Sequence, residues 1–212
     1  MLRKSIARRS TCQKKSEPSG LAVSGNLVLF RYNLERRARV AKRFQTEQWV
    51  PFPVDRVFLF FANPNNLPRI MPPSAGTRLD HVKLVAPPSP PVSQAAQITS
   101  ELAGVGSEIV TSFRILPFLP LRAKWIALIT EFEWNHHFAD IQKKGPFKSF
   151  HHRHELVPLM RDGRDGTIVR DIIDLDVGFG VLGAVVQTLF AGPELKKTFA
   201  HRQSALQGLL SE

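Results

Sequence analysis

The chain has 212 residues, of which 43% are hydrophobic, and a formal net charge of +11. This length supports one full hydrophobic core, so the sequence predicts one domain of about 150 residues plus a tail. No stretch approaches the roughly 18 to 20 apolar residues of a membrane span, and a single cysteine excludes an intrachain disulfide and a cysteine-based metal cage. We therefore expect a soluble, cytoplasmic protein.

The positive charge is concentrated near the N-terminus. Residues 1–44 carry 12 Lys and Arg against two Glu, whereas residues 45–212 carry 17 Lys and Arg against 16 acidic residues. The first segment also lacks apolar periodicity, which predicts a disordered tail over 1–44 and a folded domain over 45–212. Because the domain is almost neutral, we expect it not to bind nucleic acid. The tail could make an accessory contact to nucleic acid or to an anionic membrane.

Other interpretations of the tail remain open. The string "LAVSGNLVLF" (Leu21 to Phe30) comes late, is short and is interrupted by polar residues, so it would be a poor secretory signal. An organelle-type presequence and residues translated from an over-long start assignment are two further possibilities.

The regular pattern begins at Ala41. Residues 41–50 alternate as a strand does, and Pro51 and Pro53 end that strand. The segment "VDRVFLFFANP" then has apolar residues at helical spacing and stops at Pro64. A second short helical turn follows, which Asn63 or Asn65 can cap and which Pro72 and Pro73 close.

The chain then changes to the period of strands. Strands are predicted at residues 78–86, 106–116, 121–134, 137–143, 147–159 and 166–178, and their spacing indicates an antiparallel meander. "RDGRDG" (Arg161 to Gly166) is typical of a hairpin turn. After the strands, apolar residues recur at 182, 185, 186, 189, 195, 199, 206, 209 and 210, the stripe of a long amphipathic helix.

This order and several local strings resemble the SRPBCC (START-like, helix-grip) superfamily. The strings include "VPFPVDRVFLFFANPNNLPRIMPP", "GPFKSFHHRHEL", "GTIVRDIIDLDVGFGVLG" and "FAHRQSAL", and the likeness covers roughly residues 44–211. Within the superfamily the sequence is most similar to bacterial cyclase/dehydrase-type ligand-binding proteins. The resemblance implies an α+β fold, in which a curved antiparallel sheet wraps around a long C-terminal helix and a cavity between them accepts an apolar ligand. Gly192 and Pro193 depart from the pattern and predict a kink or break in that helix.

The most concentrated polar motif is "FHHRHEL", which places three histidines within four positions. Alternate residues of a strand face the same side, so Phe150, His152 and His154 share the more apolar face, whereas His151 and Arg153 share the other. On the following predicted strand Asp171 lies on the apolar-biased face, as the only carboxylate there. His152, His154 and Asp171 are therefore expected to converge.

Three interpretations of this convergence remain open. Two histidines and one carboxylate are typical of open iron or zinc sites. They also suit general acid/base catalysis in a cyclase or dehydratase, with His152 or His154 moving a proton. The interpretation that we favour is a structural or ligand-orienting polar patch, because buried imidazoles need hydrogen-bond partners. On that basis we expect no metal and no cofactor.

The resulting functional prediction is binding or carriage of a hydrophobic small molecule that is lipid-like, polyketide-like or aromatic. An apolar pocket with few polar groups is how such sites are usually built. The residues expected to contact the ligand are Phe113, Trp125, Phe150, His152, His154, Asp171, Ile173, Phe190 and Phe199.

Overall fold

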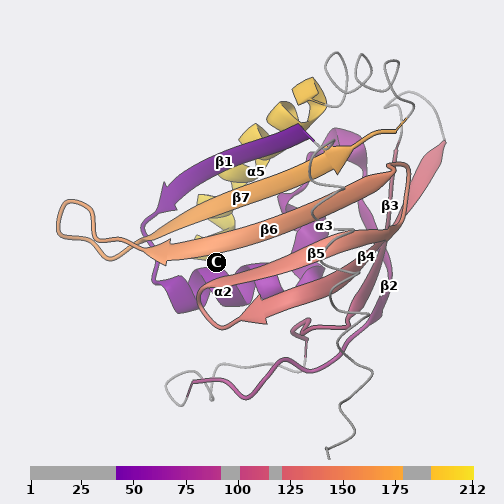
Figure 1. Ribbon diagram of the computed structural model, residues 1–212. Coiled ribbons are helices and arrows are strands. Elements are labelled where there is room, and N and C mark those ends of the chain that lie inside the picture. The colour runs from indigo at the N-terminus through magenta and orange to yellow at the C-terminus, as the bar shows by residue number, and fades with distance from the viewer. Residues whose placement is uncertain (1–41, 92–100, 115–120, 179–191) are drawn as a thin grey trace, which may run out of the picture. The chain divides into compact units, whose positions relative to one another are not determined.

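In the part of the chain that the structure describes, seven strands form one antiparallel sheet in the order β1-β7-β6-β5-β4-β3-β2. The computed structural model describes residues 42–91, 101–114, 121–178 and 192–212, all within one unit of the chain, Arg37–Glu212. The strands are β1 (Lys42–Val50), β2 (Arg78–Lys83), β3 (Glu108–Arg114), β4 (Arg122–Glu133), β5 (His137–Lys144), β6 (Ser149–Pro158) and β7 (Thr167–Asp176). The predicted meander is confirmed from β2 to β7, and β1 pairs with the last strand (Figure 1).

The start of the domain differs slightly from the sequence prediction. β1 begins at Lys42, so residues 42–44 belong to the sheet and not to the tail. Residues 1–41 of the expected tail lie outside the described residues. β2 is also shorter than predicted and ends at Lys83, before the prolines that cannot donate to a sheet ladder.

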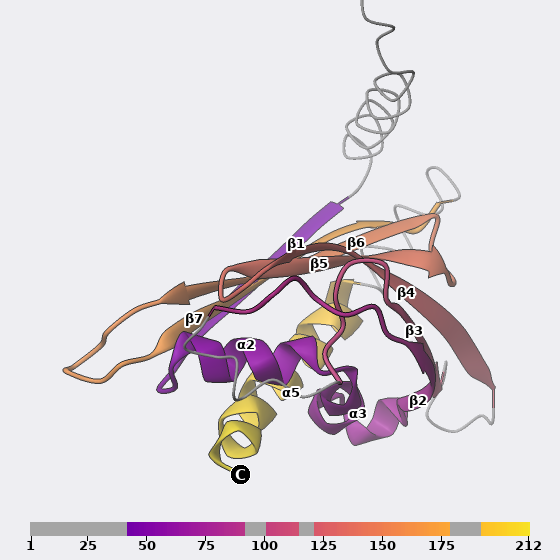
Figure 2. The same cartoon turned by 90° about the horizontal axis from the view of Figure 1, so that it is seen from below.

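The helices lie on one side of the sheet (Figure 2). α2 (Val54–Ala62) begins after Pro53 and buries Val57 and Phe58. A 3-10 turn η1 (Pro64–Asn66) follows, and the side chain of Asn63 caps it by accepting a hydrogen bond from the backbone N–H of Asn65. Next come α3 (Leu67–Ile70) and a second 3-10 turn, η2 (Pro73–Ala75).

The C-terminal helix α5 (Gly192–Ser211) crosses this inner side of the sheet. Its buried stripe consists of Phe199, Arg202, Leu206 and Leu210. The side chain of Gln203 donates to Thr46 Oγ1 on β1 at 2.8 Å, which ties the helix to the edge of the sheet. The predicted first part of the helix, residues 182–189, lies outside the described residues, and so does any kink before Gly192.

Irregular pairing bends the sheet. Between β4 and β5, Ile129 pairs with Asp140 and Glu131 pairs with Ala139, which leaves Thr130 as an extra residue in β4. A second irregularity separates Ile126 and Ala127. Because such bulges bend and twist the strand that carries them, they help the sheet to curve around the helices. At the other end of the molecule the predicted β6–β7 hairpin turn is present, with Asp162 and Gly163 at positive φ.

Candidate functional site

A cavity of about 590 Å³ lies between the inner face of the sheet and the helices α3 and α5. Its wall is mainly apolar, and most of the residues predicted to contact a ligand belong to it. The predicted residues that line it are Phe113, Trp125, Phe150, His152, His154, Ile173 and Phe199. Phe190, also predicted, lies outside the described residues.

The facing direction of β6 follows the sequence pattern. His152 and His154 are each only 6% exposed, and Leu156 is buried on the same face. His151 and Arg153 are half-buried on the opposite face, where both approach Glu131. The two inner imidazoles are in close contact, with their ring centroids 4.0 Å apart.

Aromatic rings hold both histidines in place. His154 stacks on Phe138 with a centroid distance of 4.5 Å, and Phe61 of α2 lies 5.3 Å from it. His152 meets Phe199 of α5 edge to face at 5.7 Å. Because these rings pack directly against the imidazoles, packing as well as hydrogen bonding sets the imidazole orientations.

Asp171 on β7 lies behind the two histidines and does not line the cavity, unlike the sequence prediction. Nε2 of His152 donates a hydrogen bond to Asp171 Oδ1 at 3.0 Å. Nδ1 of His154 lies 2.7 Å from the same oxygen, but at an angle outside the hydrogen-bond range, so the contact is electrostatic. The cross-strand register explains this meeting, because His154 pairs directly with Asp171. Asp171 therefore contacts the two histidines that line the cavity and is not itself part of the cavity wall.

Two charged residues of the cluster, Asp140 and Arg202, were not identified from the sequence. Asp140 on β5 pairs across the sheet with His152, and its Oδ1 lies 4.0 Å from His152 Nδ1. Arg202 on α5 is 8% exposed, and its Nη2 lies 3.9 Å from Asp171 Oδ1. Asp171 is therefore not the only inward carboxylate. A signal for Arg202 was present, since it occupies a position of the helical stripe between Phe199 and Leu206 where an apolar residue is expected.

Burial sets the protonation states of the cluster. Desolvation, with a smaller contribution from His154, lowers the pKa of His152 to about 4, and desolvation also lowers the pKa of His154. Burial raises the pKa of Asp140. Burial opposes ionisation of Asp171 as well, but the contacts from both histidines and from Arg202 outweigh it and hold its pKa well below the usual range. At neutral pH the two imidazoles are therefore neutral, and an ionised Asp171 lies beside Arg202.

The chemical possibilities follow from this arrangement. His152 and His154 present neutral nitrogens next to an apolar cavity, and Asp140 adds a carboxylate. Such a cluster can exchange hydrogen bonds with one polar group of a ligand, and it also contains the donor types of a transition-metal site. No helix in the described part of the chain combines the length and apolar character that a membrane span requires.

Comparisons with solved structures identify the architecture. A START superfamily protein from Mycobacterium smegmatis superposes with a TM-score of 0.51 at 16% identity, covering 80% of this chain and 97% of that one. A norcoclaurine synthase point mutant from Thalictrum flavum, in complex with a transition-state analogue, has a TM-score of 0.51 at 16% identity, covering 81% and 94%. A protein from Arthrobacter aurescens, solved by NMR, has a TM-score of 0.56 at 15% identity, covering 82% and 88%.

Sequence comparisons add nothing to this likeness, since no protein-family model and no curated protein matches the chain. At these low identities the structural matches establish the fold and not the function. The observed sheet, the short helices after the first strand and the long C-terminal helix agree with the predicted α+β helix-grip architecture. The chain therefore has the helix-grip fold of the START superfamily protein and the norcoclaurine synthase on which it superposes, which is the fold that the resemblance of the sequence strings implied.

Proposed function

We propose that this protein binds or carries a hydrophobic small molecule, lipid-like, polyketide-like or aromatic, in the cavity between the sheet and α5. The observation that carries the proposal is the cavity itself, whose volume of about 590 Å³ is in the usual range for ligand pockets. The fold is one that binds ligands in related structures, which supports the same conclusion.

The lining of the cavity favours an apolar ligand. Trp125 packs edge to face on Phe150 with a centroid distance of 4.6 Å, and Phe199 closes the wall from the helix side. Burial of apolar ligand surface against such a wall contributes about 25 cal/mol per Å² before the costs of binding. The polar groups are gathered at one place, around His152 and His154, so they would fix the orientation of a ligand that carries one polar group.

The catalytic alternative, a cyclase or dehydratase in which His152 or His154 is the general base, receives less support. A general base works best when its pKa is near the working pH, whereas burial lowers the pKa of His152 to about 4. The fold does not decide the question, because one structural neighbour, norcoclaurine synthase, is an enzyme. Asp171 fixes the ring of His152, and that positioning serves ligand binding as well as catalysis.

Native mass spectrometry of the purified protein tests the proposal directly. We expect a co-purified small molecule that is released on denaturation. Titration with a neutral fluorescent naphthylamine dye provides a second measurement, because its emission increases in an apolar site.

Two neighbouring substitutions on β4 make the dye experiment specific. Ala127 lines the cavity, so Ala127→Phe should fill part of it and weaken dye binding by roughly tenfold or more, given the loss of apolar contact area. Leu128, the next residue, does not line the cavity, and Leu128→Phe should leave binding unchanged. Equal binding by both variants and the wild type would place the dye elsewhere and remove the support for a ligand cavity.

A further inference from the structure

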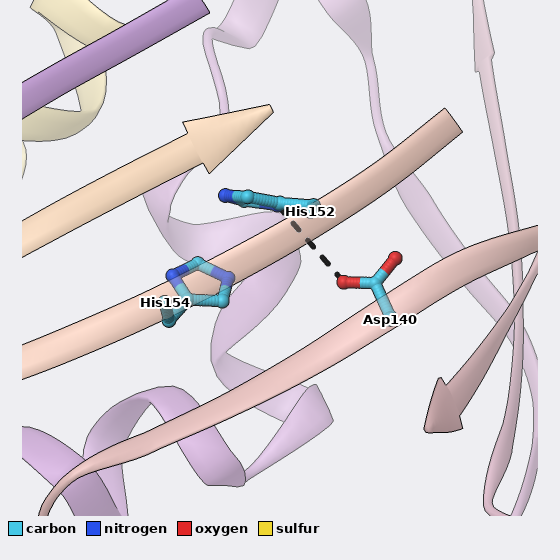
Figure 3. Close-up of side chains that lie close together, drawn as sticks. All are labelled: Asp140, His152 and His154. Carbon is cyan, nitrogen blue, oxygen red and sulfur yellow. Dashed lines mark ion pairs between the residues drawn. The ribbon is translucent and has the colours of Figure 1, made fainter. Parts of the chain in front are cut away.

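Three potential metal ligands meet at the wall of the cavity. Asp140, His152 and His154 each offer one donor atom, and these atoms all lie within 4.8 Å of one another. Figure 3 shows the carboxylate of Asp140 on β5 turned towards the ring of His152 on β6, with His154 beside it on the same strand. We propose that these three residues bind one transition-metal ion, Zn²⁺ or Fe²⁺, a site that goes beyond the proposed binding of an apolar molecule.

The sheet itself brings the three ligands together. His152 and His154 are two residues apart on one strand and share its inner face, and Asp140 is the direct cross-strand partner of His152. Donor atoms around a tetrahedral zinc ion are about 3.4 Å apart when the bonds are about 2.1 Å long. The three donor atoms lie within 4.8 Å of one another, with His152 Nδ1 and Asp140 Oδ1 4.0 Å apart, so a bound ion would draw the side chains closer together.

Asp171 supplies the outer support that metal-binding histidines usually have. Because Nε2 of His152 donates its proton to Asp171, the lone pair of His152 is on Nδ1, the atom nearer to Asp140. The same carboxylate oxygen lies 2.7 Å from His154 Nδ1, but this contact is electrostatic and not a hydrogen bond, so the outer support applies to His152. A carboxylate that holds the far nitrogen of a ligating histidine fixes its tautomer and raises its basicity towards the metal.

The charges of the cluster also favour a cation. Arg202 lies beside Asp171, and its charge offsets that carboxylate. The carboxylate of Asp140, in contrast, makes no hydrogen bond within the described residues, and its one ion-pair contact within 4.0 Å there is with the imidazole of His152. A divalent ion would neutralise this half-buried carboxylate, since a charge removed from water needs a partner.

The donor set selects the type of metal. Two imidazoles and one carboxylate suit Zn²⁺ or Fe²⁺, whereas Mg²⁺ and Ca²⁺ prefer oxygen ligands throughout. The described residues offer three protein ligands at this point, so the remaining coordination positions would face the cavity, where water or a polar group of the ligand can occupy them. The arrangement thus resembles open metal sites more than closed structural ones.

Titration of the untagged full-length protein with Zn²⁺ after dialysis against EDTA is the first test. We expect one high-affinity Zn²⁺ per chain by calorimetry, a higher melting temperature, and no comparable effect of Mg²⁺. An anomalous X-ray signal at the zinc absorption edge should locate the ion between the three side chains. Absence of Zn²⁺ binding, or an ion found elsewhere, would overturn the proposal.

Conservative substitutions assign the ligands. Asp140→Asn and His152→Gln should each weaken Zn²⁺ binding by more than roughly tenfold, and Asp171→Asn should weaken it by roughly 10- to 100-fold through the lost outer support. Circular dichroism checks that each variant is folded. If a variant does not fold, the position of the anomalous Zn²⁺ signal in the wild-type protein decides whether that residue is a ligand. Unchanged Zn²⁺ affinity in folded Asp140→Asn and His152→Gln would refute the assignment.

The matched controls are histidines outside the cluster. His151→Ala, on the outer face of the same strand, should retain full Zn²⁺ affinity. His137→Ala is a second control, because His137 lies near the carboxylates of Glu131 and Glu133 and is the obvious adventitious site. Loss of binding in His137→Ala but not in His152→Gln would show that the ion binds this outer group, and the cavity site would be rejected.

Discussion

Strands β6 and β7 carry charged and titratable residues on both faces, but the two faces place these residues in different environments. On the inner face His152, His154 and Asp171 are almost fully buried, with 5–6% of their surface exposed. On the outer face Arg153, Glu155 and Arg170 form ion pairs that remain in contact with water. The residues of the two groups alternate along the same strands, so one step in the sequence changes the surroundings from partly solvent-exposed to buried.

The two faces show how burial changes the energetic contribution of charged and titratable side chains. Outer pairs such as Arg153 to Glu131, with an N···O distance of 2.5 Å, lie beside solvent that competes for both charges. Exposed pairs of this kind are each worth about 0–1 kcal/mol. In the inner cluster each group depends on its neighbours, because removal of one partner leaves another without compensation.

The largest effect is expected for Asp171→Asn. This change leaves the buried Arg202 without its countercharge, and breaking a buried pair in this way costs about 3–5 kcal/mol. Urea unfolding at pH 7 measures the loss. Asp174→Asn is the matched control, since Asp174 lies on the outer face of the same strand and pairs with the exposed Arg43; it should cost at most about 1 kcal/mol. Similar losses in both variants would remove the distinction between the faces.

The metal-free protein is expected to lose stability at acid pH. His152 has a folded pKa of about 4 against an ordinary value of 6.5, so the unfolded chain binds a proton in this range that the native state does not. The stabilising contribution is therefore complete above pH 6.5 and is lost as the pH falls towards 4, with a change on the order of 3 kcal/mol.

The other members of the cluster modify this pH dependence. His154 acts in the same direction as His152, because burial lowers its pKa as well. Asp140 acts in the opposite direction, because its raised pKa makes the native state bind its proton more readily. Asp171, with its lowered pKa, stays ionised across this range. Urea unfolding at pH 7.5 and 4.5 should show the net loss, and the loss should be smaller in His152→Gln. An equal loss in that variant would assign the pH dependence to other groups.

A smaller contrast is expected between adjacent histidines. His152→Ala removes a buried hydrogen bond to Asp171 and should cost about 1–3 kcal/mol. His151→Ala, on the outer face, should change the free energy of unfolding by no more than roughly half a kcal/mol. Thermal and urea unfolding of the two single variants compare the faces directly. A costly His151→Ala together with a neutral His152→Ala would mean that the strand faces the other way.

The smallest effect is expected for deletion of residues 1–40. We predict that the melting temperature stays within a few degrees, because a basic segment without apolar periodicity buries too little area to offset its ordering entropy. Differential scanning calorimetry of the truncated and full-length chains checks this. A large decrease would mean that the tail contributes to the domain, and the boundary near the start of β1 would need revision.

The sequence predicted the strands, the meander and the inward face of β6, because these features depend on local alternation and turn residues. Asp140 was missed because its meeting with His152 depends on the pairing register of β5 with β6, which a strand's own pattern does not contain. Arg202 joins the cluster only once α5 is packed across the sheet. The cavity likewise depends on curvature, and its expectation came from the family resemblance.

The extra residue Thr130 in β4 has a consequence for how the strand divides its work. Before it, Trp125, Ala127 and Ile129 line the cavity; after it, Phe132 packs on Phe58 beneath α2, so the inward positions change from odd to even numbers. In this one strand, odd-numbered residues line the cavity before the bulge and even-numbered residues pack into the core after it. Deletion of Thr130 would turn either the cavity-lining residues or the core residues of β4 towards solvent. A change of side-chain size in one half of the strand leaves the inward-facing positions of the other half unchanged. β4 can therefore adapt by substitution in either half, but its length at this point is fixed.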